Sequence, residues 1–206
     1  MSIYLPHNDT AFIHIPKTGG TSILRWMKEN FEYEDRGDKH LDYNRYVKIY
    51  DVPTYHFACV RNPYARVLSW FHYMGEQAHS RLWAVQQGTL DQAEPWDEAA
   101  WRMYKRGFKI WVREAVNNPA GRMWSNQNLL QQQADWYNSD TVKFVLKTET
   151  LSEDFIQVQD WLNCYEPLGH FNKSKAGDYR EHYDFEMKLA IQRIFEKDLD
   201  TFKYTF

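Results

Sequence analysis

Residues 13–22 read IHIPKTGGTS, and this stretch decides the fold. The apolar run at residues 11–15 predicts a short buried strand, which Pro16 to Gly20 interrupt. Residues 21–31 then follow the three- and four-residue spacing of an amphipathic helix, with apolar positions at Ile23, Leu24, Met27 and Phe31. The predicted order of elements is strand, glycine-containing loop, helix.

The same order of elements recurs further along the chain. Residues 55–60 predict a second strand, and Asn62 with Pro63 provides an N-cap and first helical position for a helix that runs to about Tyr73. A third strand is predicted at residues 142–146, and further helical patterns cover 96–124, 152–162 and 183–198. Alternating strands and helices indicate an α/β fold with a mainly parallel sheet flanked by helices, in which ligands bind beyond the carboxyl ends of the strands.

The first junction has the chemistry of an anion-binding loop. Two glycines let the backbone approach a ligand, and a helix start offers N–H donors and the positive end of its dipole. The candidate residues are Lys17, Thr18, Gly19, Gly20, Thr21 and Ser22. A Walker A loop ends in Gly-Lys-Ser/Thr, whereas this lysine precedes the glycines, which argues against ordinary P-loop ATP binding. A tight turn with an exposed lysine is the structural alternative.

The second junction, FACVRNPYARVLSWF at residues 57–71, carries a second candidate anion site. Arg61 ends the strand, and Ser69 lies two turns along the next helix on the face that points back toward the helix start. A guanidinium and a hydroxyl in these positions can converge on one anion. In the alternative interpretation, Arg66 satisfies a core carboxylate and Ser69 bonds to a helical carbonyl.

Together the two junctions resemble those of sulfotransferases that use 3′-phosphoadenosine 5′-phosphosulfate, particularly the carbohydrate (sulfotransferase family 2-like) branch. The resemblance implies a P-loop-NTPase-like three-layer fold and transfer of a sulfuryl group to an acceptor hydroxyl, most simply on a carbohydrate, without a metal. It assigns the 5′-phosphosulfate to the first loop, with Lys17 neutralising charge on the departing phosphate, and the 3′-phosphate to Arg61 and Ser69. We expect residues 1–206 to form one domain, with a helical acceptor-side insertion at about 76–139, where no family motif is found.

A weaker resemblance covers the C-terminal part of the chain. The segment His170 to Ser174 is similar to the family's C-terminal loop, which implies that Lys173 and Ser174 close over the nucleotide; a solvated loop is the alternative. Residues 144–155 are similar to the family's last core strand and the turn after it.

The transfer needs a general base that titrates near neutrality, which favours histidine. In bacterial proteins that resemble this chain, a histidine lies between the first helix and the Arg-Asn-Pro strand, and His40 takes that place. His14 and His56 lie in predicted strands, where a packed core role is the simpler interpretation, and His72 is a third choice. Two carboxylates, Asp38 and Glu34, are alternatives if His40 points to solvent.

A basic stripe follows the helical pattern in the middle of the chain, formed by Arg102, Arg106, Lys109 and Arg113 beside Trp96, Trp101 and Trp111. Aromatic and basic side chains together suit an anionic saccharide. The favoured interpretation is nevertheless a solvated amphipathic helix that packs its aromatic residues inward.

The composition of the chain excludes several classes of protein. Of 206 residues, 43% are hydrophobic and 17% aromatic, which excludes a disordered chain, and a net charge of −3 argues against a nucleic-acid-coating protein. The sequence has no long apolar span, no secretory signal pattern and only two cysteines, which predicts a cytoplasmic protein without a zinc site. A small-molecule kinase with an atypical phosphate loop and a noncatalytic glycan-binding relative are the alternative functions.

Overall fold

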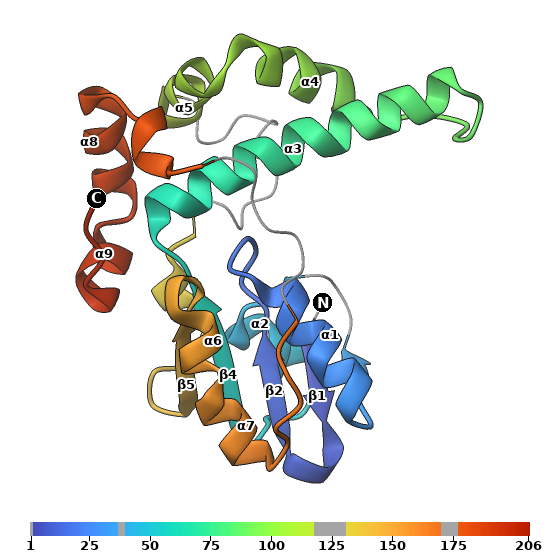
Figure 1. The fold of residues 1–206 in the computed structure, drawn as a ribbon, viewed down its shortest axis with the longest axis vertical. Coiled ribbons are helices and arrows are strands. Elements are labelled where there is room, and N and C mark those ends of the chain that lie inside the picture. The colour runs from blue at the N-terminus through green and yellow to red at the C-terminus, as the bar shows by residue number, and fades with distance from the viewer. Residues whose placement is uncertain (1, 37–39, 118–130, 170–176) are drawn as a thin grey trace. The chain divides into compact units, whose positions relative to one another are not determined.

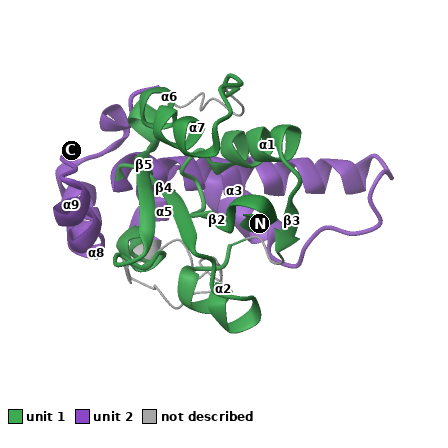
Figure 2. Ribbon diagram, turned by 90° about the horizontal axis from the view of Figure 1, so that it is seen from below, with its two compact units in different colours: residues 1–62, 131–173 green, residues 63–130, 174–206 purple. Residues whose placement is uncertain are grey.

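The structure is a computed structural model and describes residues 2–36, 40–117, 131–169 and 177–206. Two compact units are distinguished, each assembled from two segments of the chain. The first unit comprises residues 1–62 and 131–173, and the second comprises residues 63–130 and 174–206 (Figure 2).

The first unit is built on a five-stranded sheet in the order β3-β1-β2-β4-β5 (Figure 1). Its strands are β1 (Ser2–Leu5), β2 (Thr10–Ile13), β3 (Glu34–Arg36), β4 (Tyr55–Val60) and β5 (Val142–Lys147). β2, β4 and β5 pair in parallel, whereas β1 pairs antiparallel with both β2 and β3. Within the described residues, β1 therefore runs against the other strands, and the prediction of a mainly parallel sheet is confirmed.

Helices cover both faces of this sheet. On one face lie α1 (Gly20–Asn30), α6 (Leu151–Asp154) and α7 (Ile156–Leu162), and on the other lies α2 (Tyr43–Ile49), as Figure 2 shows. The first face forms one core cluster that includes Phe12, Phe57, Trp26 and Phe155. On the second face the Tyr43 ring of α2 packs against His56 of β4. The expected three-layer α/β arrangement is confirmed in this unit.

The short connections of the first unit carry 3₁₀ turns. These are η1 (Pro6–Asn8), η3 (Gln133–Asp135) and η4 (Thr148–Thr150). η3 is followed by the fully buried Trp136, whose carbonyl accepts a hydrogen bond of 2.8 Å from the Tyr43 backbone N–H. The segment around η3 is thereby joined to the first turn of α2.

The second unit is helical. Its elements are α3 (Pro63–Gln86), α4 (Asp97–Arg106), α5 (Phe108–Asn117), η5 (Tyr179–His182), α8 (Phe185–Ile194) and α9 (Glu196–Phe202). Aromatic residues dominate the core, as the contacts of Phe71 with Phe108 and Trp111 illustrate. α3 and α4 approach closely at Gly75, where an added Cβ would lie 2.2 Å from the Tyr104 ring.

Four of the expected helices differ in extent or continuity. The pattern at 152–162 is divided into α6 and α7, and that at 183–198 is divided into α8 and α9, which ends at Phe202. α3 begins at Pro63 as predicted but continues to Gln86 rather than Tyr73. The helical pattern that starts at Trp96 is divided into α4 and α5 at Gly107, whose φ of 91° is incompatible with a continuous helix. Among the described residues, no helix combines the length and the apolar character needed to cross a bilayer.

Candidate functional site

The loop between β2 and α1 has the backbone geometry of an anion cradle. Lys17 and Gly19 both have positive φ, at 69° and 80°, and α1 begins at Gly20 without a side-chain cap. The buried Thr18 uses its hydroxyl inside the loop, donating to the Ile15 carbonyl at 2.9 Å. The start of a helix can offer N–H donors to an anion, although the Ser22 N–H of this turn donates to the Gly19 carbonyl at 3.1 Å.

His14 and His40 lie directly beside this loop. A Cβ at Gly20 would lie 2.2 Å from two atoms of the His14 ring, so glycine is required for this close approach. The rings of His14 and His40 are 4.8 Å apart, and His40 Nδ1 lies 3.2 Å from the His14 carbonyl oxygen. A carbonyl only accepts, so Nδ1 carries the hydrogen in the neutral ring and Nε2 carries the lone pair.

Arg61 follows β4, the parallel neighbour of β2, and reaches the same loop. Its Nη1 donates to the Lys17 carbonyl at 3.4 Å. The next backbone N–H, that of Asn62, donates to Glu149 Oε1 at 2.8 Å. The first unit thus brings together Lys17, Gly20, Arg61 and His40 at the carboxyl end of the parallel strands.

Thr148 joins the two junctions directly. Its hydroxyl lies 2.8 Å from the Thr18 carbonyl oxygen and 2.9 Å from that of Val60. Thr148 and Glu149 belong to the stretch 144–155 that sequence similarity singled out, although that similarity did not indicate these contacts. One hydroxyl therefore holds the first loop against the end of β4.

Gln133 is a residue at this site that sequence analysis missed. It is fully buried, its Oε1 accepts from the Arg61 N–H at 2.9 Å, and its Nε2 donates to the Arg61 carbonyl at 2.8 Å. Gln133 lies in the region where no family motif was found, and a single glutamine among neighbouring glutamines carries no sequence signal for this contact.

The other predicted site residues differ in location and burial. Ser69 is half-buried on α3 of the second unit. Lys173, Ser174 and Asp38 lie outside the described residues. Thr21 is exposed and Ser22 is buried in the first turn of α1.

Arg66 fits the alternative interpretation of a core cation. It is fully buried in α3, and burial lowers its pKa to about 10. The Asp198 carboxylate acts in the opposite direction and partly offsets this lowering of the Arg66 pKa. Asp198, on α9, is fully buried as well.

The competing bases have structural partners of their own. His56 is fully buried, its Nε2 accepts from the Asn138 N–H at 3.3 Å, and burial lowers its pKa to about 4. In the second unit, His72 Nδ1 lies 3.2 Å from the Tyr104 hydroxyl, and burial lowers the pKa of His72 as well. Glu34 accepts from Arg36 at 2.8 Å. These contacts tie each of these competing bases to a structural partner.

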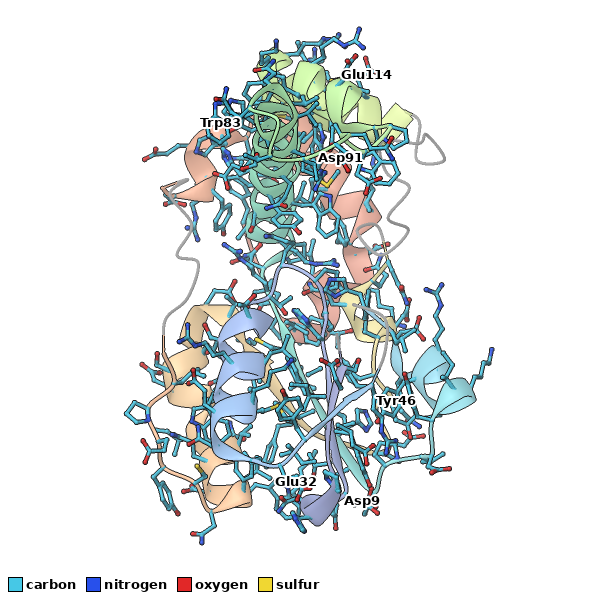
Figure 3. All side chains as sticks on the ribbon, turned by 90° about the vertical axis from the view of Figure 1, so that its right-hand side faces the viewer. Asp9, Glu32, Tyr46, Trp83, Asp91 and Glu114 are labelled. Carbon is cyan, nitrogen blue, oxygen red and sulfur yellow. The ribbon has the colours of Figure 1, made fainter. Side chains whose placement is uncertain are left out.

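The basic stripe of α4 and α5 is paired with acidic residues. Arg102 lies 3.7 Å from Glu98, and Arg106 lies 3.7 Å from Glu114, which Figure 3 labels. Further along the stripe, Lys109 pairs with Asp184 and Arg113 with Glu186. Together with the buried Trp111, these pairs favour the interpretation of a solvated amphipathic helix.

Within the part of the chain that the structure describes, no group of three or more His, Cys, Asp or Glu side chains is placed to hold a metal ion.

Comparison with known proteins gives two findings. A sequence model described as the sulfotransferase family matches residues 2–205. The crystal structure of mouse sulfotransferase SULT7A1 complexed with PAP is similar with a TM-score of 0.46 and 10% sequence identity, covering 95% of this chain and 85% of that chain. No curated protein sequence matches the chain.

Proposed function

This chain belongs to the sulfotransferase family, and from that premise we propose that it transfers a sulfuryl group from 3′-phosphoadenosine 5′-phosphosulfate to a carbohydrate hydroxyl, with His40 as general base. The product is adenosine 3′,5′-bisphosphate. Residues of about 76–139 select the acceptor in this proposal, since in the sequence they lie between the second junction and the last strand, and inspection of the sequence identified no family motif there.

The observation that carries the proposal is the meeting of the two junctions. The Arg61 guanidinium contacts the Lys17 carbonyl at 3.4 Å, and the His40 ring lies 4.8 Å from that of His14. A donor that carries two phosphate-like groups and one transferable group needs anion-binding residues and a base at one edge of the sheet. Lys173 and Ser174 belong to the proposed site as residues that close over the nucleotide, and Ser69 as a ligand of its 3′-phosphate.

The residues of the first loop fit a phosphosulfate. Gly20 lets the His14 ring pack against the loop, the dipole of α1 favours negative charge at its start, and Thr21 and Ser22 lie in the first turn. The donor supplies the sulfuryl group and leaves as the bisphosphate. Lys17 offsets the charge that grows on the departing 5′-phosphate oxygen as the S–O bond breaks.

His40 activates the acceptor. With Nδ1 directed at the His14 carbonyl, Nε2 takes the proton from the acceptor hydroxyl while the acceptor oxygen forms its bond to sulfur. The proton ends on His40 and the negative charge on the bisphosphate, so atoms and charge balance. In-line positioning and charge stabilisation supply most of the rate, as in phosphoryl transfer.

Binding distinguishes this function from an ATP-dependent kinase. Isothermal titration with adenosine 3′,5′-bisphosphate and with Mg-ATP is expected to show tight binding of the bisphosphate. Tight binding of Mg-ATP alone would overturn the proposal in favour of a kinase. Turnover of labelled donor with a panel of sugar acceptors separates an enzyme from a noncatalytic glycan-binding relative, which would bind the sugars without sulfating them.

Two cationic residues have separable effects. Lys17→Ala is expected to remove most turnover and retain part of the nucleotide affinity, whereas Arg61→Ala should weaken bisphosphate binding by about 1.5 to 3 kcal/mol. Lys28→Ala and Arg25→Ala are matched controls, because these two α1 side chains form ion pairs with Asp35 of β3 at 3.1 Å and with Glu29 of α1 at 2.7 Å. Unchanged bisphosphate affinity in the Arg61 variant would refute its assignment.

His40→Ala tests the base. Donor binding should persist while the chemical step slows by roughly 10² to 10⁴. His7→Ala is the control, since the His7 side chain is 79% exposed and pairs with Glu32. Normal turnover in the His40 variant would assign the proton transfer to another group.

A further inference from the structure

The backbone of Arg61 lies just beyond the end of the sheet. The parallel pairing of β4 with β5 ends at Val60 and Lys147, and that of β4 with β2 ends at Ala58. At Arg61 the Gln133 side chain accepts from the backbone N–H at 2.9 Å and donates to the carbonyl at 2.8 Å. A side-chain amide has the donor and acceptor of a peptide group. The Gln133 side chain therefore makes the two hydrogen bonds to Arg61 that the backbone of a neighbouring strand would otherwise make.

Burial keeps the contact between the Gln133 amide and the Arg61 backbone in place. Gln133 is fully buried, so solvent does not compete for its amide, and both hydrogen bonds have ordinary lengths. The neighbouring Trp136 is fully buried too and accepts from the Tyr43 N–H of α2 at 2.8 Å. The Trp136 N–H also donates to the Gln133 carbonyl at 3.1 Å. Gln133 is therefore connected through Trp136 to α2, which covers the sheet, and through its side chain to the Arg61 backbone.

We propose that Gln133 is a positioning residue for nucleotide binding: its amide fixes the Arg61 backbone so that the guanidinium is held for the 3′-phosphate. This inference rests on the proposed function, in which Arg61 binds that phosphate. Gln133 itself touches the backbone of Arg61, and its effect reaches the nucleotide through Arg61.

The 3′-phosphate provides a readout that a general structural role would not move. Adenosine 5′-monophosphate has the same adenosine and 5′-phosphate but lacks the 3′-phosphate. Replacing Gln133 by methionine, which has similar length and no amide, should lower bisphosphate affinity by about tenfold to a hundredfold. Affinity for the monophosphate should change by less than about threefold.

The experiment is isothermal titration of both nucleotides into full-length wild type, Gln133→Met and Gln159→Met, with a thermal melt of each to confirm folding. Gln159 is the matched control, because its Nε2 also donates to a backbone carbonyl, that of Glu166 at 2.8 Å, but on the exposed surface of α7. In an Arg61→Ala background, Gln133→Met should add less than about threefold to the loss, since the two residues act through one contact.

The outcomes separate this inference from the function on which it rests. Wild type that binds neither nucleotide would overturn the proposed function. Wild type that binds the bisphosphate, with Gln133→Met losing affinity for both nucleotides equally or for neither, would overturn the positioning role alone. If Gln133→Met does not fold, Gln133→Glu keeps the acceptor for the Arg61 N–H and removes the donor, and the same selective loss is required of it.

Discussion

At the scale of single residues, the candidate site is held by side chains that bond to backbone rather than by side chains that face a ligand. Lys17 adopts φ of 69°, a conformation that costs a residue with a Cβ roughly 1 kcal/mol. Its carbonyl accepts from Arg61, and the next residue, Thr18, is fixed through both its hydroxyl and its carbonyl. These bonds stabilise a strained loop before any anion binds, which is the condition for preorganised binding.

Thr148 offers a test of that preorganisation. Its hydroxyl lies within 2.9 Å of the carbonyl oxygens of Thr18 and Val60, and valine would keep its shape while removing the hydroxyl. Thr148→Val should weaken bisphosphate binding by about 1 kcal/mol or more, because the two carbonyls lose the one hydroxyl that they share and the loop loosens. Thr148→Ser keeps the hydroxyl and should retain near wild-type affinity by calorimetry. Equal affinity in the two variants would show that the hydroxyl does not order the loop.

At the scale of elements, the strands that the sequence predicted are those with apolar, β-branched or aromatic residues. β4 was predicted at its observed bounds, because five of its six positions are buried. β3 has the sequence Glu-Asp-Arg and was missed, since its charged side chains show no strand pattern and its position comes from pairing with β1. β1 was missed as well, although three of its four positions are buried. Local pattern therefore identified β2, β4 and β5, whereas β1 and the polar edge strand β3 follow from long-range pairing.

The same distinction applies to the candidate site. Its loop residues could be predicted because glycine, lysine and hydroxyl side chains are adjacent in the sequence. Gln133 could not, because its partner Arg61 is 72 positions away and a single buried amide has no periodicity. The contact of His40 with the His14 carbonyl spans 26 positions and was likewise beyond local pattern, although the choice of His40 itself came from resemblance.

The helices α3 and α9 are expected to depend on one buried charge pair. Arg66 and Asp198 are both fully buried, and the Asp198 carboxylate opposes the lowering of the Arg66 pKa by burial. Asp198→Asn leaves the guanidinium in the core without its counter-charge, which should lower the free energy of unfolding by about 3 to 5 kcal/mol. Asp200→Asn, an exposed position on the same helix, is the control in urea denaturation. A loss below about 1 kcal/mol would mean that other groups compensate the Arg66 charge.

At the scale of the whole molecule, both units are assembled from segments distant in the sequence. In the second unit the Tyr183 hydroxyl donates to the Tyr64 carbonyl at 2.8 Å across 119 positions. In the first, β5 joins β4 after the entire segment 63–130 has intervened. Such pairings follow from burial of complementary apolar faces, which a linear pattern does not specify, and this is why the grouping of α3 with the C-terminal helices was not predicted.

The stability of the molecule should fall in acid because of one buried histidine. His56 is fully buried on β4, its ring centroid lies 4.4 Å from that of Tyr43, and burial lowers its pKa from 6.5 to about 4. Between those values the unfolded chain binds a proton that the folded chain does not, so the free energy of unfolding decreases as pH falls from about 6.5 to about 4. Because one pKa unit corresponds to about 1.4 kcal/mol, this group contributes up to about 3 kcal/mol to the loss.

Urea denaturation of wild type and His56→Gln at a series of pH values isolates this contribution. Glutamine keeps an acceptor for the Asn138 N–H, which now bonds to His56 Nε2 at 3.3 Å, but it does not titrate. The carboxylates contribute equally to the acid response of both proteins. As pH falls from 6.5 toward 4, the free energy of unfolding should therefore decrease more in wild type than in His56→Gln. A difference that stays constant over this range would show that His56 is protonated as readily in the folded chain as in the unfolded one, which is incompatible with its burial on β4.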